Sequence, residues 1–328
     1  MKDIDIVIPW VDGADRAWLK EKEKYSGDAY SDDSIVRYRD WDNLKYLFRS
    51  IDQFLPFVRK VHFVTWGHIP YFLNVNCKKL NIVKHSDYIP KEYLPTFSSH
   101  VIELNLHRIP DLAEHFIYLN DDMFFLKPQQ KEFYFKDNLP VDLCMEIPHQ
   151  FFSGQIDYII GSNLAVINEN FDKKTAIAKN KSKWYSLKLG KVALKNMYMR
   201  PFATFCGFYN HHVASPYLKS TFETVWQTVP DVMDKTCRDK FRQSENVNQW
   251  LFRYWQFASG TFSPTKQAKG KLFTIGKDDV QIKDAIVSRR YNCICLSDDD
   301  KNIDFEVEKH NINKLLEGIL PDKSSFEV

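Results

Sequence analysis

The sequence holds few glycines, only 11 in 328 residues, whereas glycine makes up about 7% of an average protein. This scarcity excludes collagen-like and glycine-rich repeat architectures. Neither a G-x-G-x-x-G stretch nor a Walker A motif occurs, so a dinucleotide-binding fingerprint and a P-loop kinase lose their main support. No apolar run reaches the length of about 18 residues that a membrane-spanning helix needs, and no transmembrane helix is predicted.

The sequence also lacks a large excess of charge of either sign, and it lacks closely spaced pairs of cysteines. The net charge is +2, which gives no electrostatic case for a nucleic-acid partner. The six cysteines form no C-x-x-C pair and no zinc spacing, so we expect buried thiols. The first residues, MKDIDIVIPWVDGAD, do not resemble a signal peptide. We therefore expect a cytoplasmic protein, with peripheral contact at the inner membrane face left open.

The composition otherwise describes an ordinary globular protein. Hydrophobic residues make up 44% and charged residues 27%, which excludes general disorder. The 25 Phe, 16 Tyr and 8 Trp suffice for a large core and also suit stacking against sugars or nucleotides. The length corresponds to about two domains, or to one large α/β domain with an insertion.

Hydrophobic periodicity predicts alternating strands and helices. Short apolar runs predict strands at 4–9, 61–65, 81–84 and 116–119. Apolar residues at three- and four-residue spacing predict helices from Asp40 to a stop at Pro56, from Ser98 or Ser99 to 107, over 216–258 with one break at Pro230, and at 307–319. Strands that alternate with helices favour a mainly parallel sheet, which binds ligands at the carboxyl ends of its strands.

Acidic residues follow two of the predicted strands. Asp121 and Asp122 come after the strand at 116–119, where adjacent carboxylates can hold a divalent cation. A turn or a helix cap explains the pair about equally well. For Asp12 and Asp15, which follow the first strand, the turn is the stronger explanation. The run Asp298-Asp299-Asp300 is more often a solvated loop than a metal site.

Basic residues offer further candidates. Arg37, Arg39 and Arg108 could clamp a phosphate through bidentate hydrogen bonds, although a surface salt bridge is commoner for a single arginine. His107, His211 and His212 titrate near neutral pH and are candidate bases, or else structural hydrogen-bonding residues. The lysine-rich stretch 172–200 is either a solvated helical face or a surface that attracts an anionic membrane or an anionic polymer.

Taken together, these residues resemble the Stealth family of sugar-phosphate transferases, which has four characteristic blocks. IDIVIPWVDGAD at 4–15 resembles the first block. The second extends from RYRDWDNLKYLFRSI to FIYLNDDMFF over 37–125. NHHVASPYLKSTFE and KFRQSENVNQWLF, within 210–252, resemble the third, and CICLSDDD with the tail LLEGILPDKSSFE, within 293–327, resembles the fourth. The chain departs from the family at Trp66, His68 and Ser297, where Asn, Gln and Asn are usual.

The resemblance implies a reaction and its residues. An acceptor sugar hydroxyl attacks the β-phosphorus of a nucleoside diphosphate sugar, a phosphodiester forms, and UMP leaves. Asn120, Asp121 and Asp122 would be the metal and diphosphate site, with Mg²⁺ or Mn²⁺ held by Asp121 and Asp122. His212, with His211 as a rival, His107, Arg108 and Asp122 would be catalytic. The substrate-binding residues would be Asp12, Asp15, Arg37, Glu103, Asn120, His211, Arg242 and Asp298.

The expected fold is α/β, a Rossmann-like nucleotide-sugar transferase core with an open, mainly parallel sheet and a largely helical insertion. Residues 1–328 would form a single catalytic unit, with the core from 1–150 and about 260–328 and the insertion at about 165–260. The expected partners are a UDP-sugar donor and a saccharide acceptor, lipid-linked or polymeric, with peripheral membrane contact through 173–200 left open and no nucleic acid. The alternatives are a metal-dependent glycosyltransferase that releases UDP and a noncatalytic carbohydrate-binding protein.

Overall fold

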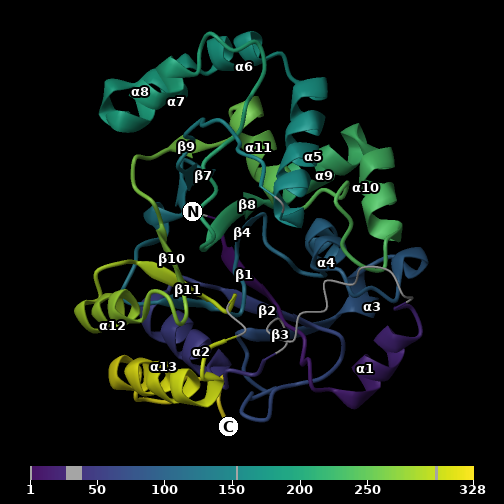
Figure 1. Cartoon of the computed structure of the whole chain (residues 1–328), viewed down its shortest axis with the longest axis vertical. Coiled ribbons are helices and arrows are strands. Elements are labelled where there is room, and N and C mark those ends of the chain that lie inside the picture. Colours follow the sequence, from purple (N-terminus) through teal and green to yellow (C-terminus); the bar gives the residue numbers. More distant parts are fainter. Residues whose placement is uncertain (1, 27–38, 153, 300–301) are drawn as a thin grey trace.

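The computed structural model describes residues 2–26, 39–152, 154–299 and 302–328, and it is organised around a five-stranded sheet (Figure 1). The sheet has the order β3 (Leu80–Lys84), β2 (Lys60–Thr65), β1 (Ile4–Pro9), β4 (His115–Tyr118), β8 (Ser215–Leu218). All neighbouring pairs are parallel except β4 and β8, which are antiparallel. This mainly parallel order confirms the predicted Rossmann-like α/β core.

The central strand β1 shows why the sheet lies in the middle of the protein. Ile6 and Ile8 belong to a core on one face, whereas Val7 belongs to a second core on the other face. This alternation follows from the two-residue period of a strand. Both faces are therefore covered, as expected for a mainly parallel sheet. The predicted strands at 4–9, 61–65, 81–84 and 116–119 are all confirmed within one residue at each end.

Two smaller sheets flank the central one. One has the order β10 (Gly270–Thr274), β11 (Cys293–Ser297), β5 (Met123–Phe125), and the other the order β6 (Phe135–Lys136), β7 (Leu139–Asp142), β9 (Ser263–Pro264). Strand β5 directly follows Asp122 and pairs antiparallel with β11. The amide of Leu296 donates to the carbonyl oxygen of Asp122 over 2.9 Å. The C-terminal part of the chain thus returns to the end of β4.

Helices cover the face of the sheet that carries Ile6 and Ile8. Helix α2 (Leu44–Phe54) buries Leu47, Phe48, Ile51 and Phe54 and ends before Pro56, as its spacing predicts. Its Arg49 binds the carboxylate of Glu327 and the carbonyl oxygen of Leu320. The C-terminal helix α13 (Phe305–Ile319) is thereby tied against α2.

Helix α12 (Asp279–Ser288) lies beside α13, and its Ile282, Ala285 and Ile286 belong to the same core as Ile6 and Ile8. The helices in the upper part of Figure 1 are α5 (Gln155–Asn170), α6 (Lys173–Lys179), α7 (Lys181–Tyr185), α8 (Lys191–Tyr198), α9 (Lys219–Thr228), α10 (Pro230–Arg238) and α11 (Trp250–Ser259). Helices α1 (Arg16–Glu23), α3 (His85–Tyr88) and α4 (Ser99–Leu104) lie toward its right. Short 3₁₀ turns are η2 (Lys91–Tyr93), η3 (Leu106–Arg108), η4 (Lys131–Phe133) and η5 (Leu187–Leu189). In the described ranges, no helix combines the length and the apolar character required to cross a membrane.

The prediction of helix over the whole of 216–258 is wrong at two places. Residues 215–218 form β8 at the edge of the sheet, and no helix covers 239–249. A short apolar run cannot be assigned to helix or strand by periodicity alone, and here pairing with β4 decides. All six cysteines are free thiols, and four of them are buried, while Cys77 and Cys206 are partly exposed. The division into a core and an insertion at about 165–260 stays a prediction.

Candidate active site

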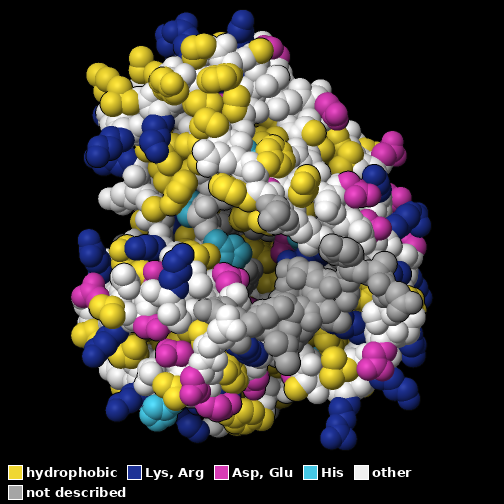
Figure 2. Space-filling view, in the orientation of Figure 1, with side chains coloured by type: hydrophobic (Ala, Val, Ile, Leu, Met, Phe, Trp, Pro, Cys, Tyr) yellow, Lys and Arg dark blue, Asp and Glu magenta, His cyan; other side chains and the backbone are white. Residues whose placement is uncertain are grey.

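A cavity of about 360 Å³ lies beyond the carboxyl ends of β1 and β4, and the face shown in Figure 2 is hollowed near its middle. Its lining comes from six separate parts of the chain: Trp10, Val11, Asp12, Gly13, Arg39, Asp40, Trp41, Asn43, Leu44, Asn120, Asp121, Asp122, His212, Arg242, Leu296, Ser297, Asp298 and Asp299. This is the edge of a parallel sheet at which ligands bind.

The run Asn120-Asp121-Asp122 connects β4 to β5 at the floor of this cavity. Asp121 is exposed and lines the cavity. Desolvation by the protein atoms at the cavity floor, together with the neighbouring Asp122, raises the pKa of Asp121 to about 7. Burial likewise raises the pKa of Asp122 to about 6. Two adjacent carboxyls that resist ionisation are typical of a site that requires a compensating positive charge.

The surroundings of Asp122 are suited to binding a divalent cation. Its Oδ2 accepts a hydrogen bond from the Cys295 thiol over 3.2 Å, whereas its Oδ1 is buried without a partner. One ligand atom each from Asp122, His212 and Cys295 lie within 4.8 Å of one another. Burial first, and then Asp122, raise the pKa of Cys295 well above its usual range, so the thiol stays protonated and the carboxylate oxygens remain the donors. Oxygen donors suit Mg²⁺ and Mn²⁺.

The two neighbouring histidines have different surroundings. His212 lines the cavity, and its Nε2 lies 2.9 Å from the amide nitrogen of Asn120. Burial lowers the pKa of His212, so its imidazole is neutral near pH 7. His211 is buried beside Arg253 and Asp142, and burial followed by the Arg253 charge lowers its pKa to about 3. The structure therefore separates the rival bases and places His212 alone at the cavity.

Arg242 enters the cavity from the segment between α10 and α11. Its guanidinium donates to the hydroxyl of Ser99 over 2.5 Å, and its backbone carbonyl accepts from the Gln155 side chain. Among the described residues, no carboxylate lies within ion-pairing distance of Arg242. Glu103 is buried nearby, accepting from the Tyr118 hydroxyl and the Gln249 amide, and its burial raises its pKa despite the opposing charge of Arg242.

Asp298, in the loop after β11, also lines the cavity. Its carboxylate accepts from the indole of Trp41 over 3.1 Å and pairs with Arg39. Asp298 and Asp299 thus lie in a loop that lines the cavity, where Asp298 is half-buried and Asp299 is exposed, and Asp300 lies outside the described residues. The partners of Asp298 are 257 and 259 residues away and leave no local signal in the sequence.

Asp12 and Asp15 lie in the loop after β1. Asp12 lines the cavity, and its Oδ1 accepts from the Ala14 amide in a local turn. Asp15 caps α1 by accepting from the Trp18 amide over 2.8 Å. The ring of His68 accepts from the Asp12 amide over 2.8 Å and approaches Asp15 to 3.7 Å. Asp12 thus makes a turn and Asp15 a helix cap, while Asp12 in addition lines the cavity.

His107 and Arg108 do not line the cavity. Both lie in η3, where Arg108 is exposed, stacks over Trp226 and donates to Asn105. His107 is buried between Phe222 and Trp226, and this burial lowers its pKa to about 3. Arg37 lies outside the described residues.

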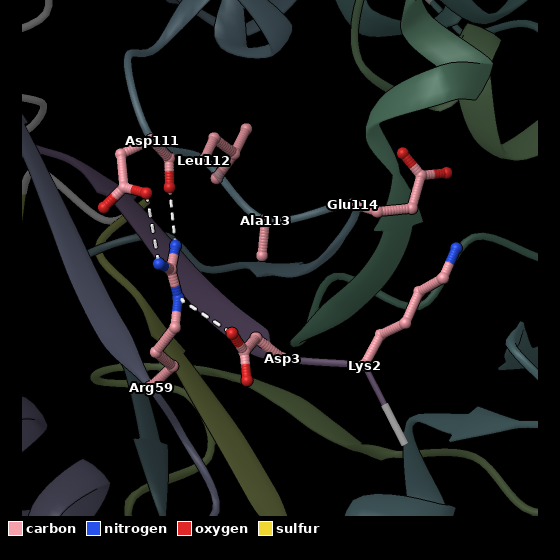
Figure 3. A pocket seen from close by; sticks show the side chains of 7 residues that line it. All are labelled: Lys2, Asp3, Arg59, Asp111, Leu112, Ala113 and Glu114. Atoms are coloured by element: carbon pink, nitrogen blue, oxygen red, sulfur yellow. Dashed lines mark hydrogen bonds and ion pairs between the residues drawn. The ribbon is translucent and has the colours of Figure 1, made fainter.

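A second pocket, of about 500 Å³, lies at the amino ends of the parallel strands (Figure 3). Its Arg59 is held by the carboxylates of Asp5 and Asp111 and by the carbonyl oxygen of Asp111. Figure 3 shows the contacts of Arg59 with Asp3 and Asp111. The only guanidinium among the residues that line this pocket is thus already paired, and the arrangement is that of a structural ion network.

Sequence reasoning did not nominate Cys295, Trp41 or Ser99 as site residues, and it named Ser99 only as a helix start. Each acts through a partner that is distant in the sequence: Cys295 on Asp122, Trp41 on Asp298, and Ser99 on Arg242. The run CICLSDDD carried a signal for Cys295, because residues two apart in a strand point to the same face of the sheet, and Cys295 lies two before the strand end at Ser297.

Comparisons with known proteins show the family to which the chain is similar. Residues 2–30 match the family model described as Stealth protein CR1, conserved region 1, and residues 37–142 match Stealth protein CR2, conserved region 2. The placement of the third and fourth blocks stays a prediction. Capsular polysaccharide phosphotransferase WcwK of Streptococcus pneumoniae is 38% identical over 100% of this chain and 98% of its own length.

Two further relatives match along their whole length. Receptor polysaccharide phosphotransferase WefC of Streptococcus oralis is 35% identical over 100% of both chains. Exopolysaccharide phosphotransferase cps2G of Lactiplantibacillus plantarum is 32% identical over 99% of this chain and 96% of that protein.

Among solved structures, galactosyltransferase LgtC in complex with donor and acceptor sugar analogs has a TM-score of 0.41 and 10% identity, over 97% of this chain and 96% of that chain. Glycosyltransferase GlyE of Streptococcus pneumoniae TIGR4 also has a TM-score of 0.41 and 10% identity, over 99% of this chain and 65% of that chain. Structural similarity this low gives no information about the substrates of this chain. The full-length identity to three phosphotransferases, with the two matched regions, shows that the chain belongs to the Stealth family of phosphotransferase enzymes.

Proposed function

We propose that this enzyme transfers a hexose-1-phosphate or N-acetylhexosamine-1-phosphate from a UDP-sugar to a hydroxyl of a saccharide acceptor, forming a phosphodiester and releasing UMP. One observation carries the proposal: Asn120, Asp121 and Asp122, His212 and Arg242 meet around a single cavity although they come from three distant segments. A phosphoryl transfer needs positive charge at the phosphates, correct positioning, and a base for the attacking hydroxyl.

Asp121 and Asp122 are the residues that would hold a divalent cation, Mg²⁺ or Mn²⁺. When bound, the cation neutralises negative charge on the donor diphosphate. The Cys295 thiol donates a hydrogen bond to Oδ2 of Asp122, whereas Oδ1 has no hydrogen-bond partner among the described residues. Cys295 therefore orients the carboxylate and is a positioning residue.

His212 is the base in this proposal. Asn120 donates to its Nε2, which marks that nitrogen as the unprotonated, proton-accepting one. An acceptor hydroxyl that replaces the amide contact can give its proton to Nε2 while its oxygen bonds to the β-phosphorus. The bond from that phosphorus to the oxygen bridging the two phosphates breaks, and UMP leaves with this oxygen.

Arg242 is the proposed phosphate ligand. Its guanidinium is held by a neutral hydroxyl and not by a carboxylate among the described residues, so its charge is available to the donor. Ser99 and the buried Glu103 support it from the far side. We assign no role in the reaction to His107 and Arg108, because both side chains are engaged away from the cavity.

The relatives named as capsular, receptor and exopolysaccharide phosphotransferases support a role in cell-surface polysaccharide synthesis. We place the reaction in the cytoplasm, with an acceptor that is polymeric or lipid-linked. The proposal is tested by incubating the protein with UDP-hexoses or UDP-N-acetylhexosamines, an acceptor glycan and Mg²⁺ or Mn²⁺, and separating the nucleotides. UMP is expected, and His212→Ala should abolish its release. Stoichiometric UDP would identify a glycosyltransferase instead, and no turnover with any donor would favour a carbohydrate-binding protein.

A further inference from the structure

Helix α8 (Lys191–Tyr198) is apolar on two opposite faces. Val192, Ala193 and Asn196 form its buried face. Leu194, Met197 and Tyr198, which are one helical face by their three- and four-residue spacing, are 65%, 53% and 79% exposed. A helix on the surface of a soluble domain ordinarily turns polar side chains outward. The outer face of α8 therefore lacks the partner that its composition requires.

Neighbouring residues extend this face. Leu187, in the turn η5 before α8, is 94% exposed, and Phe202, just after the helix, is about half exposed. We call Leu187, Leu194, Met197, Tyr198 and Phe202 the α8 patch. Figure 2 shows apolar side chains gathered over the region of α7 and α8, with lysine and arginine side chains at its edge.

The α8 patch is rigidly presented. The Asn196 amide donates to the carbonyl oxygens of Cys144 and Trp184, and its oxygen accepts from the Glu146 amide. Lys173 pairs with the buried Glu146 and donates to the carbonyl oxygen of Met199, which follows the helix. These buried contacts fix α8 to the body of the protein, so its exposed apolar face is not a consequence of fraying.

Basic residues accompany the α8 patch. The stretch 173–200 contains nine lysines and arginines and no acidic residue. Lys188, Lys191 and Lys195 are exposed and flank the apolar side chains, and Arg200 follows them. Positive charge beside exposed leucine, methionine and tyrosine is the composition of a segment that lies in the interface of an anionic bilayer.

We propose that the α8 patch docks on an anionic lipid bilayer, with its apolar side chains below the headgroups and its lysines among them. An anionic polysaccharide would satisfy the lysines and would leave Leu187, Leu194 and Met197 in water. A second copy of this chain would bring lysines against lysines. The bilayer is the partner that accepts both kinds of side chain.

Cosedimentation of the full chain with vesicles, without any substrate, tests this inference. We expect binding to phosphatidylcholine vesicles that contain phosphatidylglycerol, and weaker binding to pure phosphatidylcholine. Lys188→Gln, Lys191→Gln and Lys195→Gln together should weaken binding about fivefold per residue at low salt, and added salt should reduce this part of the affinity. Leu194→Ser with Met197→Ser should weaken binding roughly tenfold or more at every salt concentration.

Val280 and Val287, on the distant helix α12, provide the matched control because both are strongly exposed and apolar. Their replacement by Ser should leave vesicle binding unchanged, and circular dichroism should show all variants folded. No binding by the unmodified protein would overturn the inference, as would equal loss in the α12 variant. Binding to soluble polyglucuronate that Leu194→Ser does not weaken, without vesicle binding, would identify an anionic polymer as the partner. These results do not depend on the proposed reaction, because no turnover is measured.

Discussion

Arg242→Ala gives the sharpest test of how the cavity binds the donor. The guanidinium faces the cavity, is held by the Ser99 hydroxyl, and has no carboxylate within ion-pairing distance among the described residues. A hydrogen bond to a charged group contributes about 1.5–3 kcal/mol. Loss of the phosphate contact should therefore lower kcat/KM by roughly 10- to 150-fold.

Arg108→Ala is the matched control for that measurement. Arg108 carries the same charge and belongs to the same stretch of sequence as Glu103, but it is exposed, stacks over Trp226 and does not reach the cavity. Surface contacts of this kind contribute about 0–1 kcal/mol, so kcat/KM should change little. Steady-state kinetics with the donor varied compares the two variants, and Arg242→Lys should retain part of the activity. An equal loss in both alanine variants, or none in Arg242→Ala, would refute the assignment.

Three further predictions follow from the surroundings of single residues. His212→Ala should lower kcat by about 10²- to 10⁴-fold, whereas His211→Asn, which alters a buried cluster, should mainly lower the melting temperature. Because burial lowers the pKa of His212, the acid limb of the wild-type pH–rate profile should lie below pH 6.5 when saturating Mn²⁺ keeps Asp121 and Asp122 ionised, and an unchanged profile in His212→Ala would contradict the role. Asp122→Asn should weaken Mn²⁺ binding at least about tenfold in calorimetric titration without substrate, and undiminished affinity would place the cation elsewhere. Burial lowers the pKa of Lys269 from 10.5 to about 7, so above pH 7 the unfolded chain holds a proton that the folded chain lacks. The free energy of unfolding should therefore rise by about 2 kcal/mol from pH 7 to pH 9, and urea unfolding should show this extra rise in the wild type and not in Lys269→Met.

The sequence predicts the centre of the sheet well. Strand β1 and helix α2 have strong local patterns, an apolar run and a three- and four-residue spacing, and both form where those patterns lie. Strand β8 was missed because Ser215–Leu218 is a short run whose structure depends on pairing with β4. Local sequence patterns therefore predict the elements that have their own hydrophobic periodicity. They fail for an element such as β8, whose structure depends on a strand that is distant in the sequence.

The same physical distinction applies to the candidate site. Asn120, Asp121 and Asp122 carry a local signal, two carboxylates at a strand end, and they lie in the cavity. Nothing local separates His212 from His211, or Arg242 from Arg108. Those differences arise from packing, which buries His211 against Arg253 and leaves Arg108 on Trp226. Residue type and order suffice to nominate such residues, but tertiary structure selects among them.

The fate of the donor's β-phosphorus tests the central claim most directly. A UDP-sugar labelled at that phosphorus would be incubated with the protein, an acceptor glycan and Mn²⁺, and the label would be followed into glycan and nucleotide. Sugar-1-phosphate transfer places the label in the glycan and releases unlabelled UMP. Label recovered entirely in UDP, with a glycan free of phosphorus, would contradict the account.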